Sequence, residues 1–101
     1  MVTGGRGFLG SHVVAKLHQR GADAVGVGSA EADLTDPEQT QRLFDEVRPE
    51  VVIHCAVQGG GIGWMRDHPV ESGRDNARIN INALDAAHRS GASLFIGASS
   101  T

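Results

Sequence analysis

The amino-acid sequence predicts an α/β fold, a doubly wound parallel sheet with helices on both faces. Short apolar or β-branched runs alternate along its 101 residues with longer stretches of helical periodicity. Strands that alternate with helices pair in parallel through right-handed crossovers. A glycine-rich turn also stands between the first expected strand and the first expected helix, as at the ligand-binding edge of such sheets.

Five short runs predict the strands of this sheet. Residues 51–56 form a continuous β-branched and apolar run, which is typical of a strand buried on both faces of a parallel sheet. Residues 94–97 predict a last buried strand. The other three strands are expected at residues 1–3, 24–27 and 33–34. The expected strand order is 3-2-1-4-5, which places the carboxyl ends of the first and fourth strands side by side.

Three stretches predict helices, over residues 9–20, 37–47 and 69–89. The second has Asp36 as a capping residue and Pro37 at its first position, and both residues favour a helix start. The side chains expected to face the sheet are apolar and recur at helical spacing: Leu9, Val13, Val14, Leu17, Leu43, Phe44, Val47, Ile79, Ala83, Leu84 and Ala87.

The composition indicates one globular domain, with 40% hydrophobic residues, 21% charged residues and a net charge of −3. No basic stripe suggests a nucleic-acid surface. Cys55 is the only cysteine, so no internal disulfide is expected, and no cluster of histidines and thiols suggests a metal. No apolar run approaches the roughly 18 residues of a membrane span, and no signal peptide is visible. We therefore expect a cytoplasmic protein.

The glycine turn predicts a site for a dinucleotide pyrophosphate. Residues 3–10 read T-G-G-R-G-F-L-G, and three of the four glycines, Gly4, Gly7 and Gly10, are spaced G-x-x-G-x-x-G. Gly4 permits a sharp turn, Gly7 lets the backbone approach phosphates, and Gly10 lets the helix pack closely. The N–H groups at the start of the helix then face the anion. The alternative is a glycine-rich turn that binds no ligand.

Two observations bear on the choice between NADP and NAD. The Arg6 guanidinium lies in the glycine turn and can reach a ribose 2′-phosphate, although a solvated arginine is an equal alternative. An NAD site normally offers a carboxylate at the end of the second strand, whereas residues 27–30 read V-G-S-A and Glu31 follows late. NADP is therefore favoured, and NAD remains open.

The joint pattern resembles the extended short-chain dehydrogenase/reductase family, which comprises NAD-dependent nucleotide-sugar epimerases and dehydratases. The segments that carry this resemblance are V-T-G-G-R-G-F-L-G-S-H-V at 2–13, D-L-T-D at 33–36, V-V-I-H-C-A at 51–56 and L-F-I-G-A-S-S-T at 94–101. A second set of residues is similar to the GDP-L-fucose synthase branch: Arg6-Gly7, G-G-G-I at 59–62, His68-Pro69, Asn76 and residues 82–87.

The resemblance implies a Rossmann-like, truncated N-terminal dinucleotide-binding domain over residues 1–101, without a substrate domain. The longer parent would transfer hydride between NADP (or NAD) and C4 of a nucleotide-linked sugar. The family's catalytic Tyr-x-x-x-Lys pair has no counterpart here, because the sequence contains no tyrosine. The chain alone is therefore expected to bind cofactor without turnover. The alternative is a free-standing, non-catalytic nucleotide-binding or self-associating module. On either reading, we expect a homo-oligomer through the sheet edge or helices.

The resemblance also implies roles for individual residues. Asp33 would bond the adenine amino group beside Leu34, or would merely be an acid at a strand end. Asn76 would lie near the active site, or would face solvent. Ser100, or else Ser99, would bond the reacting oxygen of the substrate as a catalytic residue. The expected cofactor-binding residues are Gly4, Arg6, Gly7, Phe8, Leu9, Gly10, Ser29, Asp33, Leu34, Ala56, Val57, Gln58 and Asn76.

Overall fold

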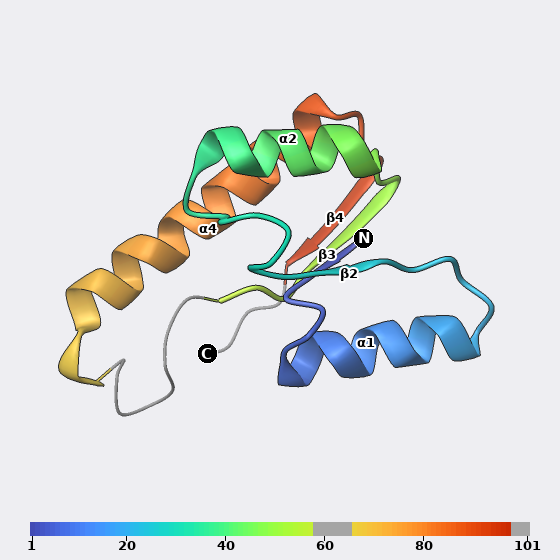
Figure 1. Cartoon of the computed structure of the whole chain (residues 1–101), viewed down its shortest axis with the longest axis horizontal. Helices are drawn as coiled ribbons and strands as arrows, with labels where there is room; N and C mark the ends of the chain where they lie inside the picture. The colour runs from blue at the N-terminus through green and yellow to red at the C-terminus, as the bar shows by residue number, and fades with distance from the viewer. Residues whose placement is uncertain (58–65, 98–101) are drawn as a thin grey trace.

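A computed structural model of the chain describes residues 1–57 and 66–97, and its architecture confirms the α/β class. Within these residues, four strands form one sheet in the order β2-β1-β3-β4, and each neighbouring pair is parallel. Figure 1 shows the strands with their carboxyl ends at a common edge. The strands are β1 (Val2–Thr3), β2 (Gly26–Val27), β3 (Val51–His54) and β4 (Leu94–Gly97).

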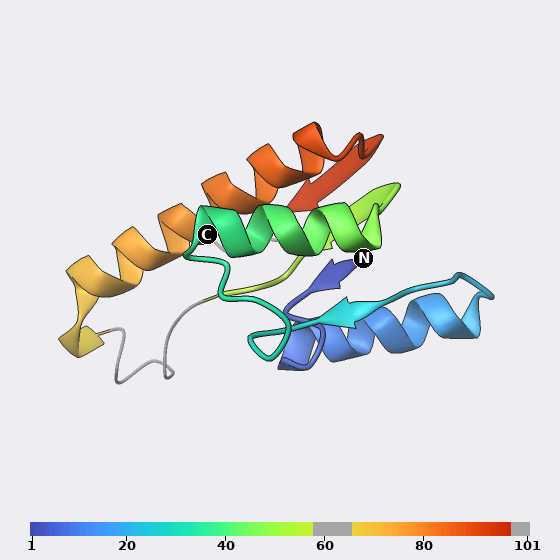
Figure 2. The ribbon, with the colours of Figure 1, turned by 45° about the horizontal axis from the view of Figure 1, so that its top comes forward.

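Three helices cover the two faces of the sheet within the described residues: α1 (Phe8–Gln19), α2 (Pro37–Val47) and α4 (Pro69–Arg89). Helix α1 packs against β1 and β2 on one face. Helices α2 and α4 pack on each other over the other face (Figure 2). None of these helices is long and apolar enough to cross a membrane.

The helix boundaries follow the local signals in the sequence. The Asp36 carboxylate accepts a hydrogen bond from the Glu38 N–H at 3.0 Å, and Pro37 is the first residue of α2, as predicted. Helix α4 spans the predicted residues. Helix α1 gives way to Gly21, whose φ of 78° is one that other residues rarely adopt.

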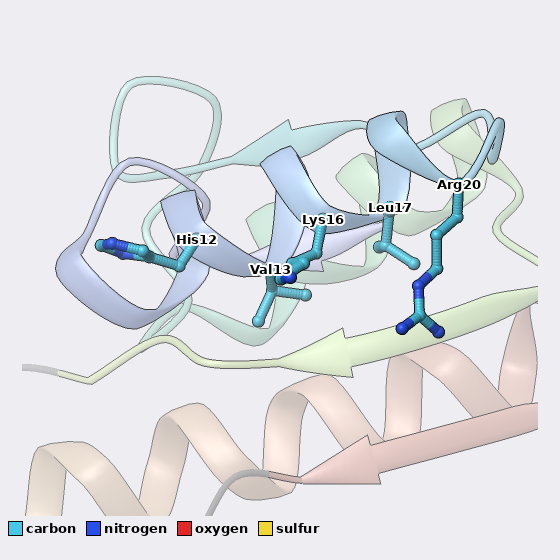
Figure 3. A pocket seen from close by; sticks show the side chains of 5 residues that line it. All are labelled: His12, Val13, Lys16, Leu17 and Arg20. Carbon is cyan, nitrogen blue, oxygen red and sulfur yellow. The ribbon is translucent and has the colours of Figure 1, made fainter.

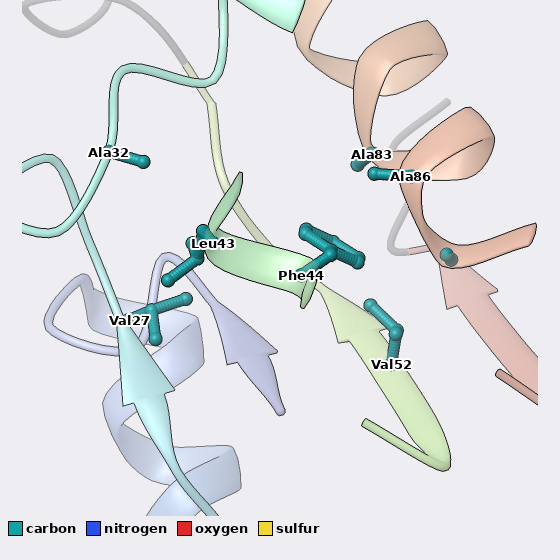
Figure 4. Close-up of a cluster of buried hydrophobic side chains, with 8 residues drawn as sticks. Val27, Ala32, Leu43, Phe44, Val52, Ala83 and Ala86 are labelled. Atoms are coloured by element: carbon teal, nitrogen blue, oxygen red, sulfur yellow. The ribbon is translucent and has the colours of Figure 1, made fainter. Parts of the chain in front are cut away.

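The hydrophobic core lies between the sheet and the layer formed by α2 and α4. Phe44 is fully buried at its centre, where it lies between Val52 of β3 and the small residues Ala83 and Ala86 of α4 (Figure 4). The alanines let α4 come close to α2, so the aromatic ring of Phe44 fills the space between the helices and the sheet.

The predicted third strand is not formed, so the order 3-2-1-4-5 is wrong at its first position. Residues 33–34 lie in a turn, where Asp33 accepts hydrogen bonds from the backbone N–H and the hydroxyl of Thr35. The carbonyl of Leu34 accepts a hydrogen bond from the Asn82 side chain on α4. Side chains therefore satisfy polar groups that a neighbouring strand would otherwise pair.

Several apolar side chains that were expected to be buried are exposed. Leu9 is 51% exposed in the first turn of α1, and Leu84 is 54% exposed because Ala83, Ala86 and Ala87 form the packed face of α4. Leu94 and Ile96 of β4 are half exposed and lie on the face that carries α1, whose main contacts are with β1 and β2. The expectation that residues 94–97 form a buried strand is therefore wrong.

Candidate cofactor-binding site

The site begins where β1 passes into the glycine turn and reaches the end of β3. Gly4 has a φ of 64°, and a Cβ at this position would lie 2.9 Å from the backbone of Ala56. The Gly5 N–H donates to the Val27 carbonyl at 3.0 Å, which ties the same turn to β2. The carboxyl ends of the first strand and of the strand at residues 51–54 are thus side by side, as predicted. Gly4 is required here for two reasons, because its φ is positive and because the Ala56 backbone leaves no room for a Cβ.

The remaining glycines of the turn have different roles. A Cβ at Gly10 would lie 2.0 Å from the Gly4 carbonyl oxygen, so Gly10 lets α1 pack on the turn rather than on the strand. A Cβ at Gly5 would lie 2.5 Å from the Cα of Gly26, a close approach that the motif spacing did not reveal. At Gly7, a Cβ would meet only the Gly4 carbonyl oxygen, at 3.3 Å. Among the glycines of the turn, Gly7 is therefore the one whose substitution the fold itself tolerates best.

The N-terminus of α1 opens from this turn without a charged or capping side chain. Gly7 is its N-cap residue and offers no side-chain hydrogen bond, and no acidic residue occupies the first turn. Phe8 and Leu9 direct large exposed side chains into solvent. The first backbone N–H groups of a helix lack partners within it and carry partial positive charge, so this end suits an anion such as a phosphate.

A buried polar pair supports the backbone beside the turn. The Thr3 hydroxyl bonds to His54 Nδ1 at 2.7 Å and accepts hydrogen bonds from the N–H groups of Cys55 and Ala56. Burial lowers the pKa of His54 and raises the pKa of the half-buried Cys55 thiol. The hydrogen-bond partners of the His54 ring are Thr3 and Asn80.

A carboxylate does lie near the end of β2, contrary to the expectation from sequence. The turn after Val27 closes with a hydrogen bond from the Glu31 N–H to the Gly28 carbonyl. The Glu31 carboxylate accepts from the Gly28 N–H at 2.8 Å and forms a two-point ion pair with the Arg6 guanidinium, with Nη1 to Oε2 at 2.8 Å. This pairing lowers the pKa of Glu31 to about 2 and raises that of Arg6.

The two residues expected at the adenine, and Asn76, which was expected near the active site, already make contacts within the protein. Asp33 is exposed, and one of its carboxylate oxygens already accepts hydrogen bonds from Thr35. These bonds lower the pKa of Asp33. Leu34 is half-buried against the hydrophobic core. Asn76 lies on α4 and donates a hydrogen bond to the Ser72 carbonyl at 2.8 Å. The roles given to these three residues remain predictions.

Some of the other predicted site residues lie within the described segments, and some lie outside them. Ser29 lies in the exposed turn after β2, and Val57 is 78% exposed just beyond β3. Gln58, the glycine-rich run 59–63, Ser99 and Ser100 lie outside the described residues. Within residues 1–57 and 66–97, no group of three His, Cys, Asp or Glu side chains is placed to hold a metal ion.

A surface hollow of about 380 Å³ lies along α1, away from the glycine turn. Figure 3 shows that its lining comes from successive turns of the helix. It therefore lies on the flank of α1 and not at the carboxyl ends of the strands, where ligands of open α/β sheets bind. Its lining residues are His12, Val13, Lys16, Leu17 and Arg20.

A glycine turn that leads into a helix N-terminus, at the carboxyl edge of a parallel sheet, defines the class of Rossmann-type dinucleotide-binding domains. Comparison with known proteins identifies the family within that class. The sequence profile of the NAD dependent epimerase/dehydratase family matches residues 1–101, and the chain belongs to this family.

Curated relatives include GDP-L-fucose synthases. The chain is 34% identical over its whole length to a probable GDP-L-fucose synthase of Drosophila melanogaster, and it covers 32% of that protein. It is 37% identical to a putative GDP-L-fucose synthase 2 of Oryza sativa, with 99% of the chain and 30% of the relative covered. The chain thus spans about a third of the length of these relatives.

Solved structures of similar fold carry both forms of the cofactor. A Naegleria fowleri GDP-L-fucose synthetase bound to NADP aligns with 95% of this chain and 29% of its own, at a TM-score of 0.82 and 30% identity. The Thermus thermophilus UDP-glucose 4-epimerase complex with NAD aligns with 93% of this chain and 35% of its own. Its TM-score is also 0.82 and its sequence identity is also 30%. Both forms therefore occur among structural neighbours at equal similarity.

Proposed function

We propose that this chain is the NAD(P)-binding part of a nucleotide-sugar epimerase or reductase of the GDP-L-fucose synthase kind. The observation that carries the proposal is the contact between Gly4 and Ala56, which brings the glycine turn, the start of α1 and the end of β3 to one edge. Family membership and relatives that act on nucleotide sugars support the same reading.

The residues present fit a dinucleotide. The N-terminus of α1 has no acid in its first turn, so no carboxylate competes with a pyrophosphate there. Gly7 leaves the space before this N-terminus clear of a side chain, and the exposed Val57 lies beyond the end of β3. In this proposal, Gly4, Gly7, Phe8, Leu9 and Gly10 hold the pyrophosphate.

The bound nicotinamide would supply hydride exchange at C4 of a nucleotide-linked sugar. A proton must move with that hydride, and in the resembled family a tyrosine and a lysine carry it. This sequence has no tyrosine, so we assign to it cofactor binding rather than proton transfer. Ser100, or else Ser99, is proposed to bond the reacting oxygen of the sugar in the longer protein.

Titration calorimetry with NAD and NADP tests the proposal, with Gly7→Val as the informative variant. The branched side chain would occupy the space that the pyrophosphate needs, so we expect loss of most of the affinity for both cofactors. The Gly7 φ of −77° is open to any residue, so circular dichroism should show a retained fold. Binding of neither cofactor to the unaltered chain, or unchanged affinity in Gly7→Val, would contradict the proposal.

A further inference from the structure

A buried hydrogen-bond network connects helix α4 to the peptide that lies against the glycine turn. His54 Nε2 bonds to Asn80 Oδ1 on α4 at 2.9 Å, and His54 Nδ1 bonds to the Thr3 hydroxyl at 2.7 Å. The Thr3 oxygen in turn accepts from the N–H groups of Cys55 and Ala56, at 3.1 and 3.3 Å. Thr3 and His54 are 0% and 4% exposed, so a partner lost here is costly to replace.

The far end of this network is the closest neighbour of Gly4. A Cβ at Gly4 would lie 2.9 Å from the carbonyl carbon of Cys55 and equally close to the N and Cα atoms of Ala56. The glycine turn therefore packs directly on the Cys55–Ala56 peptide, and the Thr3 hydroxyl holds that peptide in place. In the proposed function, on which this inference rests, the same edge receives the dinucleotide.

The network tolerates only one protonation state of the His54 ring. A hydroxyl oxygen has two lone pairs, and those of Thr3 are taken by the two backbone N–H groups. The Thr3 proton therefore points to His54 Nδ1, which must be unprotonated. A proton on Nδ1 would place two donors face to face. To accept from the ring, the Thr3 hydroxyl would have to turn its own proton away and release one of the two backbone N–H groups.

We propose that His54 is a positioning residue of the cofactor site, which acts through Thr3 on the Cys55–Ala56 peptide and which weakens dinucleotide binding when its ring takes up a proton. The neutral ring keeps the Thr3 hydroxyl, and with it the peptide that abuts Gly4, in the arrangement that receives the cofactor. The protonated ring releases that arrangement. Cofactor binding and protonation of His54 therefore oppose each other, and each lowers the affinity for the other.

The surroundings of the ring favour its neutral form. The elements packed against β3 are β1, β4 and α4, and the groups that face the ring from them are the uncharged Thr3, Phe95 and Asn80. Strands β1 and β4 contain no titratable side chain. Burial lowers the pKa of His54, and the bond to Asn80 opposes this effect without cancelling it. The ring is therefore neutral at pH 7.5 and takes up its proton only in mild acid.

Calorimetric titration of the chain with NAD from pH 7.5 to 5 tests this role. NAD is the probe because the 2′-phosphate of NADP would titrate in the same range. We expect the affinity to fall with pH, by up to about tenfold for each pH unit below the folded-state pKa of His54. Binding in mild acid should also release protons, which titrations in two buffers of different ionisation enthalpy measure. Circular dichroism at each pH corrects the affinities for any unfolded fraction.

Variants separate this positioning role from simple packing. His54→Gln keeps an acceptor and a donor but takes up no proton, so its affinity for NAD should not fall with pH and its binding should release no protons. Thr3→Val removes the hydroxyl and should weaken NAD binding at pH 7.5, whereas Thr3→Ser keeps the hydroxyl and should restore both the affinity and its pH dependence. His88→Gln, at an exposed position on α4, removes a histidine outside the network and is the control variant.

The possible outcomes distinguish the role of His54 from the proposed function. An affinity for NAD that stays constant from pH 7.5 to 5, or a fall that persists in His54→Gln, would overturn the positioning role while leaving cofactor binding intact. Unchanged binding in Thr3→Val would also overturn it, since Thr3 would then not transmit the state of the ring. If the unaltered chain binds no cofactor at pH 7.5, the proposed function fails, and the role of His54 fails with it.

Discussion

Thr3 and His54 are 51 residues apart in the sequence, and a buried hydrogen bond of 2.7 Å joins their side chains. The Thr3 oxygen already accepts from the N–H groups of Cys55 and Ala56, so its hydroxyl proton points to His54 Nδ1. His54 Nε2 then donates to Asn80 Oδ1 at 2.9 Å. This pattern requires a neutral imidazole, and it holds Ala56 in place against the glycine turn.

We predict from this pattern that the chain loses stability in mild acid. Burial lowers the pKa of His54 in the folded state below the 6.5 of the unfolded chain. The unfolded state therefore binds more protons in the window below pH 6.5. The contribution of neutral His54 is fully present above pH 6.5 and is lost as the pH falls through the folded-state pKa. Urea unfolding at a series of pH values from 7.5 to 5 measures this loss.

His54→Leu isolates the contribution of this residue. It should cost about 1–3 kcal/mol at pH 7.5, because Thr3 and Asn80 lose a partner. The difference from the unaltered chain should shrink toward pH 5. His88→Gln, at an exposed position on α4, removes a histidine outside the buried hydrogen-bond pair and is the control variant. A stability difference for His54→Leu that stays constant from pH 7.5 to 5 would contradict the assignment.

The two helix glycines Gly10 and Gly73 should respond in opposite ways to alanine. A Cβ at Gly10 would lie 2.0 Å from the Gly4 carbonyl oxygen, so Gly10→Ala must displace α1 from the turn and should lower the melting temperature markedly. A Cβ at Gly73 meets nothing within 4 Å, so Gly73→Ala should stabilise α4 by about 0.5–1 kcal/mol. Thermal unfolding of both variants measures these changes, and equal melting temperatures would show that α1 does not pack on the turn as described.

The sequence predicts well those elements whose boundaries depend on single residues. Asp36 and Pro37 start α2, and Gly21 follows α1, because each has one strong conformational preference. Residues 33–34 were assigned wrongly because a two-residue strand has little local signal. Their structure depends instead on bonds to Thr35 and to the distant Asn82.

The candidate site was predictable where its residues are neighbours in the motif, and not where the fold brings them together. The spacing of Gly4 and Gly10 already implied a close approach. Glu31 follows the second strand too late for the motif spacing to predict its place, since only the turn at Gly28 returns its carboxylate to Arg6. The bond between Thr3 and His54 depends on the pairing of β1 with β3, which no local pattern specifies.

Strand β4 offers an edge that favours pairing with another chain. It is the last strand of the described sheet and pairs with β3, and its sequence Leu94–Gly97 holds neither charge nor proline. Leu94 and Ile96 are 50% and 46% exposed. An uncharged, apolar edge strand presents unpaired backbone groups to a second strand. The apolar edge strand from which we expected a homo-oligomer is therefore present in the described sheet.

We therefore predict that the chain self-associates through β4 and that Ile96→Lys suppresses this association. A lysine on an edge strand disfavours pairing, because its charge would have to be buried or brought beside its copy. Ile81→Lys makes the same change at a 60% exposed position on α4 and should leave association through the edge intact. Light scattering over a range of protein concentrations measures the mass of each variant. A monomer at high concentration would show that the β4 edge does not pair, and loss of association in Ile81→Lys alone would place the contact on α4 instead.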